Sequence, residues 1–323
     1  MIIDTHAHTV SNRKAPTYGA LMGRWTTLEA AGTFGGRPRL PDEEELLAGA
    51  ERQLELMDAV GTGIQLTSPR PFVLKHSHKP GEIVHWWCAL NNDVIALQAG
   101  RYPERIKGIA GLPQVFGAPV TDVLDELHRC VDDLGFVGVL LNPDPSEGVG
   151  TAPTLDDEYW FPLYEELSKS DVPALIHSAG CYGRESYSEH FISEESLAIN
   201  SMIRGRIFAK FPHLKIIVPH GGGSVPYQLG RWIAHQRVTR PDEPFEEELR
   251  RFWFDTTLYT RGALGLLIDT VGADRVLFGT ERPGSGHELE NLKPVIESLD
   301  GLKPADLELI FEKNARRIFS RLS

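Results

Sequence analysis

The chain has 323 residues, 41% of them hydrophobic, and a formal net charge of -12. This acidic excess, without a basic stripe to offset it, argues against binding to the phosphate backbone of nucleic acids. The cysteines Cys88, Cys130 and Cys181 form no C-x-x-C pair, which argues against a disulfide framework and a thiolate zinc site. No leader-like start follows Met1, and no apolar run is long enough to span a membrane, so we expect a cytoplasmic protein without a membrane partner.

Short, β-branched apolar runs alternate along the chain with segments of helical periodicity, which is typical of βα units and a parallel sheet. Eight runs are predicted strands: Ile2 to His8, Gly63 to Ser68, Arg105 to Pro113, Phe136 to Asn142, Pro173 to Ser178, Leu214 to His220, Phe252 to Thr257 and Arg275 to Glu281. Predicted helices between them include Asp42 to Val60, Ile83 to Tyr102, Val120 to Leu134, Tyr159 to Lys169 and Ser196 to Phe211. Eight such pairs predict an α/β fold, the (β/α)8 TIM barrel.

The domain organisation has to be argued from the pattern, because the length alone would also allow two ordinary domains. No Gly/Ser linker, repeat or low-complexity tract divides the chain, so residues 1–323 are predicted to form one domain. Ser11 to Leu40 is too long for an ordinary βα connection and is predicted to be a lid loop over the carboxyl end of the strands. Ala179 to Glu194 is a second predicted lid.

Several predicted strands end in polar residues that a core does not need, and catalytic groups of this fold lie at the carboxyl ends of strands. His6 and His8 are two apart on a strand, so both imidazoles point to one face and can bind one ion. An H-x-H pattern alone is weak, and the two histidines can also be incidental. His177 ends an otherwise apolar strand, where the alternative is a hydrogen-bonded core histidine.

Two further polar residues end strands six and eight. His220 stands between an apolar run and three glycines that would let the backbone approach a ligand, which favours a catalytic role over packing. Glu281 ends the eighth strand, which lies beside the first once a barrel closes. It can be a metal ligand, a general base or both, and the alternative is a structural salt bridge, for instance with Arg282.

Neutral imidazoles with one carboxylate match a catalytic Zn2+ better than Mg2+ or Ca2+, while Mn2+ and Fe2+ remain open. The predicted ligands are His6, His8, His177 and Glu281. One ion is expected, because the fourth strand contains no lysine that could be carboxylated to bridge two metals. The ion would lower the pKa of a bound water, and Glu281 or His220 would act as the group that accepts and donates the proton.

This pattern resembles the amidohydrolase superfamily, in the branch that holds aminocarboxymuconate-semialdehyde decarboxylase, the benzoate-type decarboxylases and 4-oxalomesaconate hydratase. The resemblance spans the whole chain and implies that the four predicted ligands hold the metal and that His220 serves the reaction. The decarboxylases usually end strand eight with aspartate, whereas this chain has Glu281. That glutamate resembles the hydratase group, as do two segments: Ser68-Pro69-Arg70 and Pro219-His220-Gly221-Gly222-Gly223-Ser224-Val225-Pro226-Tyr227.

The resemblance implies a metal-dependent lyase that adds water to a C=C bond of a small unsaturated oxo-polycarboxylate, such as 4-oxalomesaconate, in aromatic-compound degradation. A carboxylate substrate calls for cations and polar groups at the site. The predicted substrate contacts are Arg70, Asn142, Arg184, Tyr187, Arg231 and Arg282, each of which can instead be an ordinary surface or structural residue. Cys181 is interpreted as an inert small hydrophobe.

Three alternatives stay open at this stage. The same metal site could decarboxylate an aromatic or muconate-type acid without adding water, or hydrolyse an ester, lactone or amide. A catalytically inactive barrel that acts as a scaffold is disfavoured, because such a protein would have no need for a complete set of metal ligands with an adjacent histidine. Relatives in this branch often form dimers, so a homodimer is an expectation from the resemblance alone.

Overall fold

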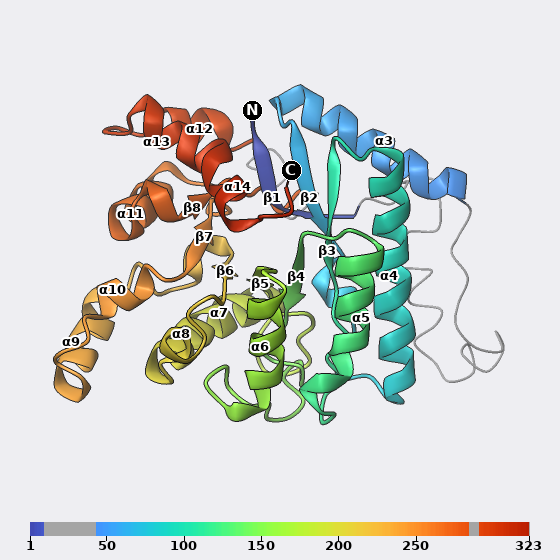
Figure 1. Ribbon diagram of the computed structural model, residues 1–323. Helices are drawn as coiled ribbons and strands as arrows, with labels where there is room; N and C mark the ends of the chain where they lie inside the picture. The colour runs from blue at the N-terminus through green and yellow to red at the C-terminus, as the bar shows by residue number, and fades with distance from the viewer. Residues whose placement is uncertain (10–42, 284–290, 323) are drawn as a thin grey trace.

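The computed structural model describes residues 1–9, 43–283 and 291–322. Its centre is one eight-stranded parallel sheet in the order β1-β2-β3-β4-β5-β6-β7-β8, so the predicted (β/α)8 barrel is confirmed (Figure 1). The strands are β1 Ile3–His8, β2 Ile64–Ser68, β3 Ile106–Ala110, β4 Gly138–Leu141, β5 Ala174–Ile176, β6 Ile216–Val218, β7 Trp253–Asp255 and β8 Val276–Leu277. Each lies within a predicted run and is shorter than it. The first predicted lid, Ser11 to Leu40, lies outside the described residues.

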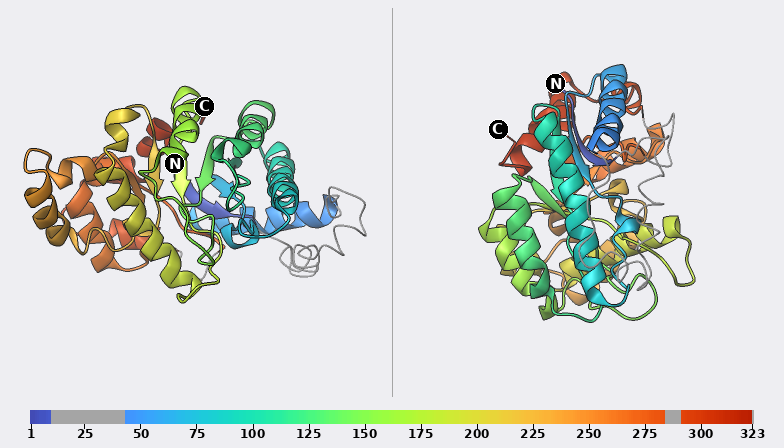
Figure 2. Two further views of the ribbon diagram at one scale, coloured as in Figure 1. Left: turned by 90° about the horizontal axis from the view of Figure 1, so that it is seen from below. Right: turned by 90° about the vertical axis from the view of Figure 1, so that its right-hand side faces the viewer.

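Helices surround the strands on the outside of the barrel (Figures 1 and 2). They are α3 Glu43–Val60, α4 Gly81–Arg101, α5 Leu124–His128, α6 Phe161–Lys169, α7 Tyr187–Arg204, α8 Ile207–Lys210, α9 Leu229–Thr239, α10 Phe245–Leu249, α11 Arg261–Val271, α12 Lys293–Glu297, α13 Pro304–Glu308 and α14 Asn314–Ile318. Among the described residues, no helix combines the length and apolar character needed to cross a membrane.

The barrel interior is filled from the strands and closed at one end by the last helix. Buried side chains that pack together there include Ile3, Leu66, Ile109, Leu140, Leu175, Ile217, Trp253 and Leu277, one from each strand. Ala315 and Ile318 of α14 and the following Phe319 join the same cluster. Burying an aliphatic side chain of this size stabilises the fold by roughly 1.5–3 kcal/mol. The amino-terminal end of the barrel is therefore filled by apolar side chains, which leaves the opposite end for a polar site.

Strand β1 carries an irregularity that decides where its histidines point. Asp4 pairs with Gln65, and Ala7 pairs with Thr67, so β1 has one more residue than β2 between these pairs. Such a bulge reverses the alternation of side chains along the strand. Ile3 faces the interior before the bulge, and His8 lies opposite Ser68 after it. Without the extra residue, the histidines would face the surrounding helices.

The residues after β8 close the barrel against β1. The backbone nitrogen of Glu281 donates to the carbonyl of His6 at 2.7 Å, and the nitrogen of His8 donates to the carbonyl of Arg282 at 3.0 Å. The buried carboxylate of Asp4 accepts from Thr280 Oγ1 at 2.6 Å and from Gln65 Nε2 at 2.8 Å. The closure places Glu281 beside the two histidines of β1, as the sequence predicts.

Helix α7 differs from the prediction. The second predicted lid ran to Glu194, but the loop ends at Ser186, where a capping box with Glu189 starts the helix. The predicted helix from Ser196 to Phe211 is in fact the end of α7 followed by the short α8. The capping box satisfies free backbone N–H groups of the first turn and so allows the helix to begin early. Half of the predicted lid is consequently part of a helix at the wall of the site.

Candidate active site and metal centre

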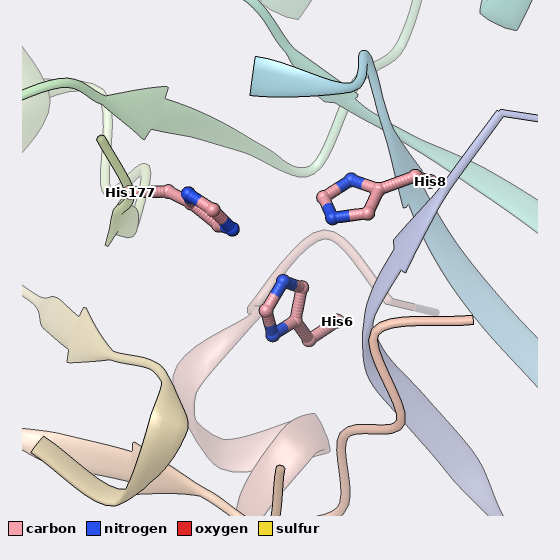
Figure 3. Close-up of side chains that lie close together, drawn as sticks. All are labelled: His6, His8 and His177. Carbon is pink, nitrogen blue, oxygen red and sulfur yellow. The ribbon is translucent and has the colours of Figure 1, made fainter. Parts of the chain in front are cut away.

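Three buried histidines converge at the carboxyl end of the barrel (Figure 3). His6 and His8 come from β1, and His177 directly follows β5. Their rings lie edge to face, with centroids 5.2 Å apart for His6 and His8 and 5.3 Å for His6 and His177. One nitrogen from each ring can be chosen so that all three lie within 4.8 Å of one another. This spacing suits donation to a single cation.

Each of these rings is held through its Nδ1 atom. His6 Nδ1 lies 2.6 Å from Asp255 Oδ2, His8 Nδ1 lies 2.9 Å from Ser68 Oγ, and His177 Nδ1 lies 3.0 Å from the carbonyl of Ser178. The Nε2 atoms of His6 and His177 are buried and make no hydrogen bond within the described part of the chain. A partner on one nitrogen that leaves the other nitrogen unsatisfied is typical of histidines that bind metals.

The charge state of the rings favours metal binding as well. Burial, together with the neighbouring His220 and His6, lowers the pKa of His177 to about 3. Burial and the neighbouring His6 and His177 also hold the pKa of His8 well below its ordinary value. His8 and His177 are therefore neutral at neutral pH, and a neutral imidazole has a lone pair that can bind a metal.

Glu281 completes a second triplet with His177 and His220, whose donor atoms also lie within 4.8 Å of one another. Its Oε2 accepts from the hydroxyl of Tyr259 at 2.7 Å. Although burial opposes ionisation, His220 and the other histidines lower the pKa of Glu281 strongly, so the carboxylate is ionised. Glu281 (φ 60°), His220 (φ 49°) and Tyr259 (φ 58°) all adopt left-handed backbone conformations. Strained residues of this kind cluster at functional sites.

His220 is held between Glu195 of α7 and Glu281. Its Nδ1 lies 2.6 Å from Oε1 of Glu195, which is fully buried in α7, and its Nε2 lies 3.7 Å from Glu281 Oε1. Phe191 stacks on the ring at 4.3 Å between centroids. Burial alone would lower the pKa of His220, but the carboxylate of Glu195 and that of Glu281 raise it well above its ordinary value. The ring is thus oriented by one carboxylate and aimed at another.

The three glycines after His220 pack closely against neighbouring elements, and their expected role in the approach of a ligand stays a prediction. Gly222 has φ 85°, and a Cβ there would lie 2.7 Å from the ring of Phe254. A Cβ at Gly223 would lie 2.6 Å from the carbonyl of Ile192 in α7. The glycines let the turn fit tightly between β7 and α7, which fixes His220 against Glu195.

The structure places two of the predicted substrate contacts near the histidines. Arg70 and Tyr187 both lie within electrostatic range of the site: beyond the larger effect of burial and the histidines, Arg70 contributes to the lowered pKa of His8, and Glu281 contributes to the raised pKa of Tyr187. For Tyr187, burial is the larger cause of the rise. Arg70 donates to the carbonyl of Pro283, directly after Arg282. Arg70, Tyr187 and the segment at Arg282 and Pro283 therefore lie around the carboxyl end of the barrel, near the histidines.

The remaining predicted contacts are arranged differently. The amide of Asn142 is buried and bonded to two neighbouring loops, to His76 Nδ1 after β2 at 2.7 Å and to the carbonyl of Asp144 after β4 at 3.0 Å. Arg184 and Arg231 are exposed, in the loop before α7 and within α9. Within residues 1–9, 43–283 and 291–322, no hydrogen bond or ion pair joins either arginine to the histidine cluster. Their roles as substrate contacts stay predictions.

Sequence reasoning missed three residues of the site. Asp255 ends β7, so the same rule that selected His177 and Glu281, a polar residue ending an apolar strand, could have found it. Tyr259 lies in the loop that follows β7. Glu195 carries no local signal, because its partner His220 lies 25 residues further along the chain. Only the packing of α7 against the turn after β6 brings the two together.

The comparisons agree with this geometry. The amidohydrolase family model matches residues 3–321. The chain is 32% identical over 337 aligned residues to 2-keto-4-carboxy-3-hexenedioate hydratase of Sphingobium sp., covering 100% of this chain and 97% of the relative. The crystal structure of 4-oxalomesaconate hydratase from Rhodopseudomonas palustris superposes with a TM-score of 0.86 at 31% identity, covering 100% of this chain and 96% of the other. Gamma-resorcylate decarboxylase of Rhizobium sp. is 30% identical, covering 91% of this chain and 94% of the relative. The chain belongs to the amidohydrolase family.

Proposed function

We propose that this protein is a metal-dependent hydratase, a lyase that adds water to the C=C bond of a small unsaturated oxo-polycarboxylate such as 4-oxalomesaconate. The observation that carries this proposal is the full-length similarity to two hydratases, at 32% and 31% identity, the second with a TM-score of 0.86. The family model spans residues 3–321, which supports one catalytic domain.

The proposed metal ligands are His6, His8, His177 and Glu281, with Zn2+ as the proposed ion. The unsatisfied Nε2 atoms of His6 and His177 support this assignment, as do the ionised carboxylate and the mixed nitrogen and oxygen donor set. When bound, the metal supplies a Lewis acid that polarises a substrate oxygen and lowers the pKa of water.

His220 is proposed to move the proton at its Nε2 atom. Glu195 holds Nδ1 and stabilises the protonated ring, and Phe191 restricts its rotation. Addition of water across a conjugated C=C bond requires one proton to leave the water and one proton to reach the carbon next to the carbonyl. A histidine with a buried carboxylate partner can hold a proton between these two steps.

The substrate carboxylates are proposed to bind at the rim formed by Arg70, Tyr187 and Arg282. Arg70 is half-buried, and its charge reaches both His8 and Tyr187. A guanidinium in such a position can bind a carboxylate through two parallel hydrogen bonds.

Mass spectrometry of the product tests the proposal directly. Zinc-loaded enzyme is incubated with 4-oxalomesaconate and, in parallel, with carboxylated aromatic acids. Gain of one water by 4-oxalomesaconate is the expected result. Absence of turnover on this substrate by enzyme that retains its metal would contradict the assignment.

Non-oxidative decarboxylation is the second candidate. The 30% identity to gamma-resorcylate decarboxylase over 91% of this chain favours it. Loss of carbon dioxide from one of the aromatic acids in the same experiment, without hydration of 4-oxalomesaconate, would assign the chain to this second activity.

A further inference from the structure

A second cluster of potential ligands lies outside the histidine site, between the loop after β4 and the first turns of α7. Asp144, His190 and Glu194 each offer one atom, and these atoms lie within 4.8 Å of one another. Asp144 and Glu194 also line a cavity of about 230 Å³ on this side of α7. The cluster is thus buried on one side and reachable from the other.

His190 is oriented as a ligand of this cluster. It is only 5% exposed, and its Nδ1 lies 3.3 Å from Glu185 Oε2. Its Nε2 meets no hydrogen-bond criterion within the described part of the chain but faces Asp144 Oδ2 at 3.4 Å, so the two groups form an ion pair when the ring is protonated. A divalent cation would replace the proton on Nε2 and bind between the ring and Asp144, while the carboxylate on Nδ1 orients the ring.

The carboxylate of Asp144 is also fixed in place. Its Oδ1 accepts from Ser146 Oγ at 2.5 Å and from the backbone nitrogen of Ser146 at 3.0 Å, and its Oδ2 accepts from the backbone nitrogen of Gly148 at 2.9 Å. A carboxylate oxygen has two lone pairs, so these bonds orient Oδ2 and leave it able to bind a cation.

The charges around the cluster are unbalanced. Glu185, Asp144 and Glu194 provide three carboxylates, while His190 is the one basic group among the neighbours that shift the pKa of Glu194. Burial, and then repulsion from Asp144, raise the pKa of Glu194 to about 7. A bound cation would remove this repulsion.

We propose that Asp144, His190 and Glu194 form a second divalent-cation site, separate from the catalytic metal. Two carboxylates and one imidazole suit Mn2+ or Zn2+. The cation would tie the loop after β4 to α7, the helix that also carries Glu195 against His220. Its role is structural: it fixes the wall of the active site without taking part in the reaction.

Metal stoichiometry of the full-length protein tests this site. The protein is equilibrated with Mn2+, freed of unbound ion by gel filtration at a fixed low Mn2+ concentration, and analysed by elemental mass spectrometry. We expect two ions per chain in the wild type and one in Glu194→Gln and in His190→Gln. The control Glu165→Gln, which removes an exposed carboxylate from α6, should retain two.

Two results would overturn the proposal. One is a wild-type chain that binds a single ion even at millimolar Mn2+, which would leave Asp144 and His190 as an ion pair only. The other is retention of two ions by both variants. If a variant misfolds, Mn2+ titration of the wild type followed by thermal unfolding gives an independent answer, since occupation of a second, weaker site raises the melting temperature in a second step.

Discussion

At the scale of single residues, the site depends on carboxylates that orient histidines. Asp255 holds His6, and Glu195 holds His220, each with 2.6 Å between the nitrogen and the oxygen. The sequence pattern could predict His177, His220 and Glu281, because each is a polar residue at the end of an apolar run. It could not predict Glu195, because a carboxylate within a helix is ordinary unless its partner across the fold is known.

Replacing His220 by Asn should reduce turnover by about 10²- to 10⁴-fold, the usual contribution of a general acid or base. Metal content should be unchanged, since His220 is not among the proposed ligands. Steady-state kinetics on 4-oxalomesaconate and elemental analysis measure the two quantities. His235→Asn, in the exposed face of α9, is the matched control. Near-normal turnover would remove His220 from the mechanism.

Replacing Asp255 by Asn should weaken metal binding by about 10- to 100-fold, the range found when a partner behind a metal-binding histidine is changed. The amide keeps the size of the side chain but loses the charge that supports His6. Competition with a chelating dye measures the dissociation constant for Zn2+. Asp269→Asn, at an exposed position of α11, should bind as the wild type does, and unchanged affinity in Asp255→Asn would argue against His6 as a ligand.

At the scale of elements, α7 contributes most to the architecture of the site beyond the strands. Ser186 caps the first turn of the helix. From the middle of the helix, Phe191 and Glu195 contact His220. At the end of the helix, Arg204 donates to Asp156 from both Nε and Nη2 at 3.0 Å. Apolar periodicity detected only its second half, since the first half is mostly polar. The Ser186 and Glu189 capping box is the local signal that would have corrected the start.

The Asp156 and Arg204 pair should contribute to stability in a pH-dependent way. Burial alone would raise the pKa of Asp156, but its hydrogen bonds to Arg204 lower it below the ordinary value. A folded-state pKa below the unfolded one stabilises the protein above the unfolded value, about 3.9, and this contribution is lost as the pH falls further. Asp156→Asn should therefore cost about 0.5 kcal/mol at neutral pH, because the Arg204 side chain is 59% exposed and solvent weakens the pair.

Urea unfolding at several pH values measures this difference, with Glu165→Gln as a control in the neighbouring α6. The difference between Asp156→Asn and wild type should shrink below about pH 4. A difference that stays constant into acid would show that the pair does not act through its charge.

At the scale of the whole molecule, the alternation of apolar runs and helical segments sufficed to predict the eight-stranded barrel and the strand ends that meet at one rim. The bulge in β1 was beyond that pattern, because it is visible only in the register of Asp4 and Ala7 against β2. His6 and His8 share a face of the strand because they are two residues apart, whichever way that face points. The bulge is what turns this face toward the barrel interior.

Removing the metal should lower the stability of the whole barrel. The proposed ligands come from β1, the end of β5 and the residues after β8, so the ion joins distant parts of the native chain. At a free metal concentration about 1,000-fold above the dissociation constant, binding to the native state contributes about 4 kcal/mol. Thermal unfolding before and after chelation should show a fall in melting temperature that Zn2+ reverses. His177→Ala should show a much smaller change, and equal shifts in both proteins would place the stabilising ion elsewhere.

The closure of β8 on β1 also has a consequence for biosynthesis. His6 and His8 leave the ribosome before Glu281, whose backbone nitrogen bonds to the carbonyl of His6 and which follows His6 by 275 residues. While these residues are being made, a nascent chain exposes two histidines without the carboxylate that completes the proposed set. Loading with metal is expected to be a late event, and a chain truncated before its final βα unit should capture the ion only loosely.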